Sequence, residues 1–85
     1  MAKRDFVRRI GLDPHHLGPA GDTAGALTCP DIWELSTGEF AVMGEDATDE
    51  LLSTLPPTAS CHPGERIIIL PRVTLLAARQ DIPKK

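Results

Sequence analysis

The residues of this chain with the most evident chemistry are its two cysteines and three histidines. Cys29, Cys61 and His62 could supply thiolate and imidazole ligands, and His15 and His16 could add two more. Zinc takes such ligands, but structural zinc sites usually draw them as cysteine pairs spaced by two to four residues. Here thirty-one residues separate the two cysteines. Reduced thiols and ordinary loop histidines are therefore the prediction. A zinc-supported module built on Cys29, Cys61 and His62 is one alternative, and a Cys29–Cys61 disulfide is another.

No catalytic set is recognisable in the sequence. Cys61 and His62 are adjacent, and adjacent side chains on extended backbone point to opposite sides. Carboxylate pairs such as Asp46 and Asp49 stand where helix-capping residues stand, and the glycine-rich motifs of nucleotide-binding loops do not occur. A core drawn from 85 residues also leaves little room for an active-site cavity of ~300 Å³. We therefore expect a protein that is not an enzyme and needs no cofactor.

The charged residues are segregated along the chain, although the net charge is only −3. Lysine and arginine stand near the two ends, whereas residues 11–65 contain neither and carry ten acidic residues. The basic ends could neutralise the acidic segment within the fold, which is the commoner arrangement. The acidic segment could instead form a patch for a basic partner.

The stretch CPDIWELSTGEFAVMG, residues 29–44, predicts a β-hairpin over residues 31–43. Two short β-type runs flank a turn in which Gly38 can supply the positive φ that such turns need. The hairpin holds the only tryptophan, Trp33, and one of the two phenylalanines, Phe40. Large side chains are few in so short a domain, so we expect these two in the core. If they face water instead, they mark the binding surface.

The remaining patterns predict one small α+β domain around this hairpin. Residues 66–70 lack polar alternation, which indicates a strand buried on both faces. We expect this strand to complete a three-stranded antiparallel sheet with the hairpin, because a hairpin alone is marginally stable. Short helices are predicted over residues 47–55 and 72–80, and an edge strand is the alternative for the second of these. Ile32 breaks the alternation of its strand, which indicates that the second sheet face is also partly covered.

The domain is predicted to span residues 29–83, and residues 1–28 to form a basic N-terminal arm and a flexible loop. Within the arm, Phe6 and Ile10 have the spacing of one face of a short helix. Glycine, proline and alanine dominate residues 13–28, which is typical of a loop. We see neither a secretory signal nor a run of ~18 apolar residues that could span a membrane. The expected location is therefore the cytoplasm, with reduced cysteines and no membrane contact.

Three stretches, CPDIWEL, GEFAVMGEDAT and ERIIILPRVTLLAA, resemble a group of small conserved actinobacterial proteins of unknown function. The resemblance covers most of residues 29–83 and extends to RRIGLDP near the N-terminus. It implies a bacterial cytoplasmic accessory protein, and it brings no activity or functional residue with it.

Residue types that protein interfaces favour gather in the hairpin beside acidic side chains. We therefore expect a small non-catalytic binding or regulatory protein that acts through protein–protein contacts, either with a basic partner surface or with a second copy of itself. The predicted contact residues are Trp33, Glu34, Glu39, Phe40 and Glu45. A nucleic-acid-binding regulator that uses the basic N-terminal arm is a further alternative, although the net charge has the wrong sign and the aromatic residues are few.

Overall fold

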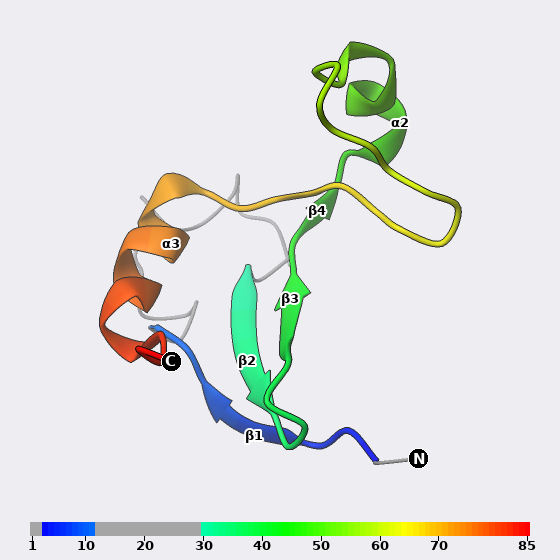
Figure 1. The fold of residues 1–85 in the computed structure, drawn as a ribbon. Helices are drawn as coiled ribbons and strands as arrows, with labels where there is room; N and C mark the ends of the chain where they lie inside the picture. The colour runs from blue at the N-terminus through cyan, green and yellow to red at the C-terminus, as the bar shows by residue number, and fades with distance from the viewer. Residues whose placement is uncertain (1–2, 12–29) are drawn as a thin grey trace.

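The computed structural model of the protein describes residues 3–11 and 30–85. Its elements in chain order are β1 (Phe6–Arg9), β2 (Asp31–Leu35), β3 (Phe40–Met43), β4 (Glu45–Asp46), α2 (Thr48–Leu51), the 3-10 turn η2 (Leu52–Thr54), β5 (Ile68–Ile69), α3 (Arg72–Ala78) and the 3-10 turn η3 (Arg79–Asp81). Figure 1 shows α3 beside the sheet of β1, β2 and β3, with α2 beyond the far end of β4. The loop predicted over residues 13–28 lies outside the described residues. Within the described ranges, no helix has the length and apolar content needed to cross a membrane.

The predicted α+β class and the three-stranded antiparallel sheet are confirmed, with strand order β1-β2-β3. The hairpin forms as predicted, and Trp33 of β2 lies opposite Ala41 of β3. In its turn, the Gly38 N–H donates to the Leu35 carbonyl at 2.9 Å, and the Leu35 N–H donates to the Glu39 carbonyl at 2.8 Å. Gly38 adopts a φ of +89°, in the left-handed region that favours glycine. A type I turn followed by such a residue is a common three-residue hairpin loop.

The third strand of this sheet is β1, which corrects the helical pattern that we inferred for the N-terminal arm. β1 pairs antiparallel with β2, with Phe6 opposite Leu35 and Arg9 opposite Trp33. A helix of so few residues is marginal by itself. As a strand, the same segment gains ladder hydrogen bonds to β2 and sets its arginines beside the acidic residues of that strand.

The strand predicted over residues 66–70 is shorter and lies elsewhere, so its assignment to the hairpin sheet was wrong. Only Ile68 and Ile69 form a strand, β5, which pairs with β4 in a separate two-stranded sheet. Ile69 is 38% exposed, so the segment is not buried on both faces as expected. The chain of β3 continues into β4 beyond the end of β2, where β5 pairs with it before the chain passes to α3 (Figure 1).

Both predicted helices form. α2 with η2 covers residues 48–54, and α3 with η3 covers residues 72–81, so the edge-strand alternative for the second segment is not adopted. The Asp46 carboxylate accepts the Thr48 N–H at 3.0 Å just before α2. Pro71, which cannot donate from its own nitrogen, immediately precedes α3.

Among the described residues, the hydrophobic core is small and lies between the sheet and α3. Ile10, Ile32 and Ala78 are its buried members, and Leu70 packs against them. The burial of Ile32 confirms that the second face of the hairpin is covered near the start of β2. So small a cluster leaves much apolar surface outside it.

Replacing Gly44, between β3 and β4, with alanine should destabilise the protein. A Cβ there would lie 2.7 Å from the Ile69 carbonyl oxygen and 2.9 Å from Ile68 Cγ2, and forcing β5 aside should cost about 1–3 kcal/mol. Urea unfolding followed by Trp33 fluorescence measures the loss. At Gly38 a Cβ meets nothing within 4 Å, and asparagine tolerates the left-handed conformation, so Gly38→Asn should stay within about 0.5 kcal/mol of the parent. Equal losses for the two variants would contradict the predicted contact.

Candidate functional site

An apolar groove lies between α3 and the sheet. Ile32 of β2 and Phe40 of β3 lie on the same face of the sheet. Trp33 and Ala41 are paired and point to the other face, and Ile32 and Phe40 are their neighbours along the two strands. The groove has a volume of about 180 Å³ and is lined by apolar side chains from β1's end, the hairpin and the C-terminal helix: Ile10, Ile32, Phe40, Leu75, Ala78 and Ile82. Its chemistry suits an apolar side chain from a partner rather than a reaction.

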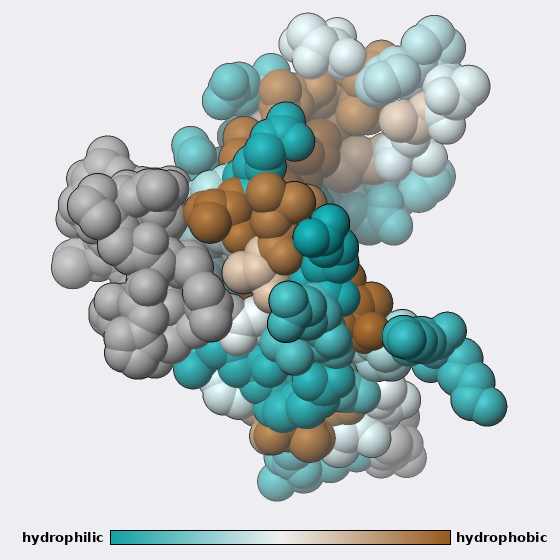
Figure 2. Space-filling view, turned by 90° about the vertical axis from the view of Figure 1, so that its left-hand side faces the viewer, coloured by the Kyte–Doolittle hydropathy of each residue, from teal (hydrophilic) through white to brown (hydrophobic). Residues whose placement is uncertain are grey.

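The side chains at the rim of the groove remain largely open to solvent. Phe40 is 43% exposed, so the expectation that it lies in the core was wrong. Leu75 is 54% exposed, and Ile82 is exposed as well. Figure 2, which views the molecule from the α3 side, shows apolar surface lying uncovered next to hydrophilic surface. Contiguous exposed apolar surface of this kind marks interaction sites in small proteins.

The strand that forms one side of this groove, β3, is an edge of the sheet. Leu35 and Glu39 are a hydrogen-bonded pair, because the Leu35 N–H donates to the Glu39 carbonyl. Bonded and non-bonded pairs alternate along an antiparallel ladder, so Ala41 directs its backbone groups toward β2. Phe40 and Val42 direct their N–H and C=O groups the other way, where the described part of the chain provides no neighbouring strand.

Two of the three acidic side chains predicted to meet a partner bind arginines of the same chain. Glu34 lies 2.8 Å from Arg8 and Glu39 lies 2.9 Å from Arg4. The Thr37 hydroxyl and, after it, Arg4 lower the pKa of Glu39 below its ordinary value. Glu45 is exposed and makes no side-chain hydrogen bond or ion pair with the described residues. The basic N-terminal segment thus neutralises part of the acidic one, as in the first of our two charge arrangements.

Trp33 points to the other face of the sheet, away from the face that carries Phe40. There it belongs to a polar network that the sequence did not reveal. The Asp31 carboxylate accepts from Arg9 Nε at 3.0 Å, from Arg9 Nη2 at 3.1 Å and from the Trp33 indole N–H at 2.9 Å. Arg9 stacks over the Trp33 ring at 4.6 Å, and Phe6 meets that ring edge-on at 5.7 Å. The spacing Asp31-x-Trp33 on one strand face was a usable signal, but the arginine could be found only once β1 was known to pair with β2.

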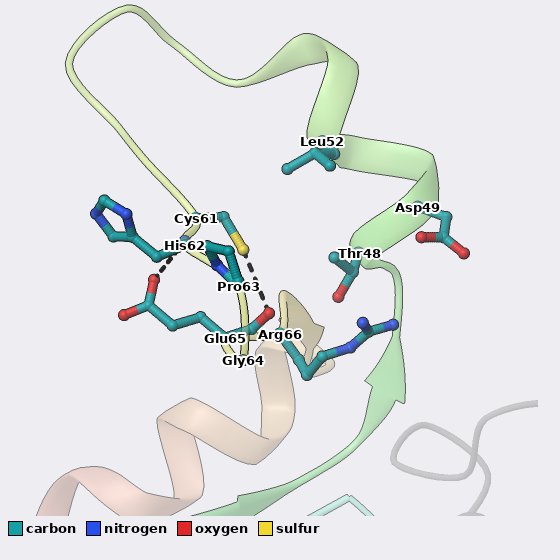
Figure 3. A pocket seen from close by; sticks show the side chains of 9 residues that line it. All are labelled: Thr48, Asp49, Leu52, Cys61, His62, Pro63, Gly64, Glu65 and Arg66. Carbon is teal, nitrogen blue, oxygen red and sulfur yellow. Dashed lines mark hydrogen bonds between the residues drawn. The ribbon is translucent and has the colours of Figure 1, made fainter.

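The cysteine and histidine side chains predicted as alternative metal ligands do not converge in the described residues. Cys61 is a free cysteine whose thiol donates to the Glu65 carbonyl at 3.5 Å. The His62 imidazole points away from this sulfur, while the His62 backbone N–H donates to the Glu65 carboxylate at 2.8 Å (Figure 3). Across residues 3–11 and 30–85, no three side chains of metal-binding type come together. Cys29 lies outside these ranges, so the zinc alternative stays a prediction.

A shallow pocket of about 270 Å³ lies between Cys61 and α2, and two of its lining residues, Thr48 and Arg66, bind the Asp46 carboxylate. The Thr48 hydroxyl donates to Asp46 at 2.6 Å and accepts the Ile67 N–H at 2.8 Å. Arg66 donates to the same carboxylate at 2.9 Å. The Thr48 hydroxyl and the Thr48 backbone N–H both donate to the Asp46 carboxylate, and these two bonds, followed by the Arg66 bond, lower the pKa of Asp46 to about 2. These contacts hold α2 to the chain that enters β5.

Comparison with protein-family models, with characterised proteins and with solved structures found no match for this chain. The resemblance to small actinobacterial proteins therefore gains no support from these comparisons. The function has to be argued from the groove and the strand edge themselves.

Removing the carboxylate of Asp31 should cost much more stability than removing that of Glu39. The Asp31 side chain is only 10% exposed and binds both Arg9 and Trp33. Asp31→Ala should cost about 2–4 kcal/mol, because it removes the carboxylate that accepts from Arg9 and from the Trp33 indole N–H. Glu39→Ala breaks an exposed pair with Arg4, and water screens such pairs, so this substitution should cost far less stability. Urea unfolding of both variants measures the difference, and similar costs would show that the Asp31 network is not a major support.

Because of the Asp46 network, the free energy of unfolding should fall at acidic pH. Because the pKa of Asp46 is lowered to about 2 in the folded protein, its stabilising contribution is complete above about pH 4, the ordinary pKa of aspartate, and is lost as the pH falls toward 2. The fall in unfolding free energy over this window should therefore be smaller in Asp46→Asn than in the parent. Asp49→Asn makes the same charge change without touching the Thr48 bonds and is the control. Parallel pH profiles for parent and Asp46→Asn would contradict the prediction.

Proposed function

We propose that this protein is a small non-catalytic binding or regulatory protein that acts through protein–protein contacts. The observation that carries the proposal is the apolar groove between α3 and the sheet, beside an edge of β3 that has no partner strand within residues 3–11 and 30–85. A partner that lays an extended segment along β3 would gain backbone hydrogen bonds and could place an apolar side chain beside Phe40 and Leu75. In this proposal the protein acts in the cytoplasm of a bacterium, as an accessory to another activity.

The chemistry of the proposed contact is mainly apolar. Glu34 and Glu39 already bind Arg8 and Arg4, so a basic partner would have to compete with those arginines for them. Glu45, just beyond β3, has no such bond among the described residues and remains suited to a cationic side chain at the end of the contact. The nucleic-acid alternative gains nothing from this arrangement, because Arg8 and Arg9 both bind carboxylates of β2.

A selection of random displayed peptides against the folded protein tests the proposal. We expect enrichment of peptides with an apolar anchor residue, and binding that weakens about tenfold or more in Leu75→Asp, since a carboxylate in the groove must be desolvated by the bound peptide. Leu52→Asp adds the same charge at an exposed leucine outside the groove and should leave the affinity unchanged. Failure to enrich any peptide, or equal weakening by both variants, would count against a groove-based function.

A further inference from the structure

The outer edge of β3 carries none of the features that usually keep an edge strand from pairing. Its sequence, Phe40-Ala41-Val42-Met43, contains no charged residue and no proline, and its ladder with β2 runs without a bulge. Phe40 and Val42 point their backbone N–H and C=O groups outward, and their side chains are 43% and 44% exposed. β1, at the other edge, has an irregular register and arginines in its sequence. The edge of β3 is therefore the one prepared for another strand.

We infer that this other strand is β3 of a second copy, paired antiparallel across a two-fold axis normal to the sheet. The inference rests on the proposed function and names its partner. An isologous contact pairs the β3 edges of both copies at once, so that no β3 edge is left for a third copy. It also keeps the grooves of the two copies on the same face of a continuous six-stranded sheet, so that residues of the groove face oppose one another across the axis.

The side chains of β3 and the flanking carboxylates of Glu39 and Glu45 select one register, with Ala41 opposite Ala41 of the second copy. In this register Phe40 faces Val42 of the other copy. By symmetry, Val42 of the first copy faces Phe40 of the other, so the same pair forms twice. Each pair joins an aromatic with a β-branched side chain, a favourable cross-strand combination, and each consists of residues whose backbone groups point outward. Glu39 then faces Met43, so that no carboxylate opposes another.

The neighbouring registers are worse for identifiable reasons. Placing Val42 on the axis sets Glu39 opposite Glu45 twice, and like charges directly opposite are destabilising. Placing Phe40 on the axis sets Val42 opposite Gly38, whose φ of +89° belongs to the hairpin turn and interrupts the extended backbone. The small side chain of Ala41 suits the crowded position at the axis, where non-bonded pairs bring Cα atoms within about 4.5 Å.

The dimer is expected to be reversible, because a four-residue edge buries less than a standard interface and suggests a dissociation constant on the order of micromolar. Light scattering over a concentration series should show the mass rise from that of the 9.2 kDa chain toward twice that value. Val42→Lys should weaken association about tenfold or more by placing a charge beside Phe40 of the other copy. Val7→Lys makes the same change at an exposed residue of the β1 edge and should leave association unchanged. Urea unfolding of each variant checks that it remains folded.

A disulfide test reads the register directly. In a background with Cys29→Ser and Cys61→Ser, Ala41→Cys should form a disulfide-linked dimer under mild oxidation, because non-bonded antiparallel pairs have the Cα separation that disulfides require. Thr37→Cys, in the turn away from the axis, should not. A monomer at every concentration, a dimer sensitive to Val7→Lys but not to Val42→Lys, or no Ala41→Cys crosslink in a dimer would each overturn the inference. Groove-dependent peptide binding by such a monomer would leave the proposed function standing.

Discussion

The antiparallel pairing of β1 with β2 is the interaction on which the rest of the described structure depends. It completes a sheet that the hairpin alone would form only marginally. It also brings the basic N-terminal segment against the acidic middle of the chain, where Arg9 forms a forked pair with the largely buried Asp31. A paired and hydrogen-bonded carboxylate can be buried at this position, whereas an unpaired one would destabilise the strand.

The same strand anchors the C-terminal helix. Arg8 donates to the Asp81 carbonyl at 2.8 Å, and the Gly11 N–H donates to the Asp81 carboxylate at 2.8 Å. These bonds hold the end of η3 next to the end of β1, and Ala78 of α3 packs on Ile10 and Ile32. The contacts tie the helix to the β1 end of the sheet, while Phe40, on the strand at the opposite edge, keeps more than two-fifths of its surface exposed. The groove therefore forms because α3 is attached to the sheet near β1 and leaves part of β3 uncovered.

A domain of this size has few apolar side chains, and this one leaves many of them in contact with water. Such an arrangement is favourable for a protein whose surface is completed by a partner, and it supports a role in protein–protein contacts. The charged residues contribute in another way. The exposed pairs Arg4–Glu39 and Arg66–Asp46 join segments distant in sequence, and each adds little by itself. Their larger effect is to occupy acidic groups that a basic partner would otherwise meet.

The sequence by itself determined the local elements. The alternation around Trp33, the turn at Gly38 and the prolines beside both helical segments were enough to predict the hairpin, the two helices and the α+β class. These features depend on residues close in sequence, whose backbone preferences are felt whatever the rest of the chain does. Only the tertiary structure decided which strand completes the sheet. Phe6–Arg9 and Ile67–Leu70 are both short, and neither segment by itself specifies the strand with which it pairs. β1 pairs with β2, where its arginines form ion pairs, whereas β5 pairs with β4 before the chain enters α3. The groove likewise joins the end of β1, the hairpin and α3, and the Asp31 network joins β1 to β2. No local pattern encodes a contact between segments so far apart.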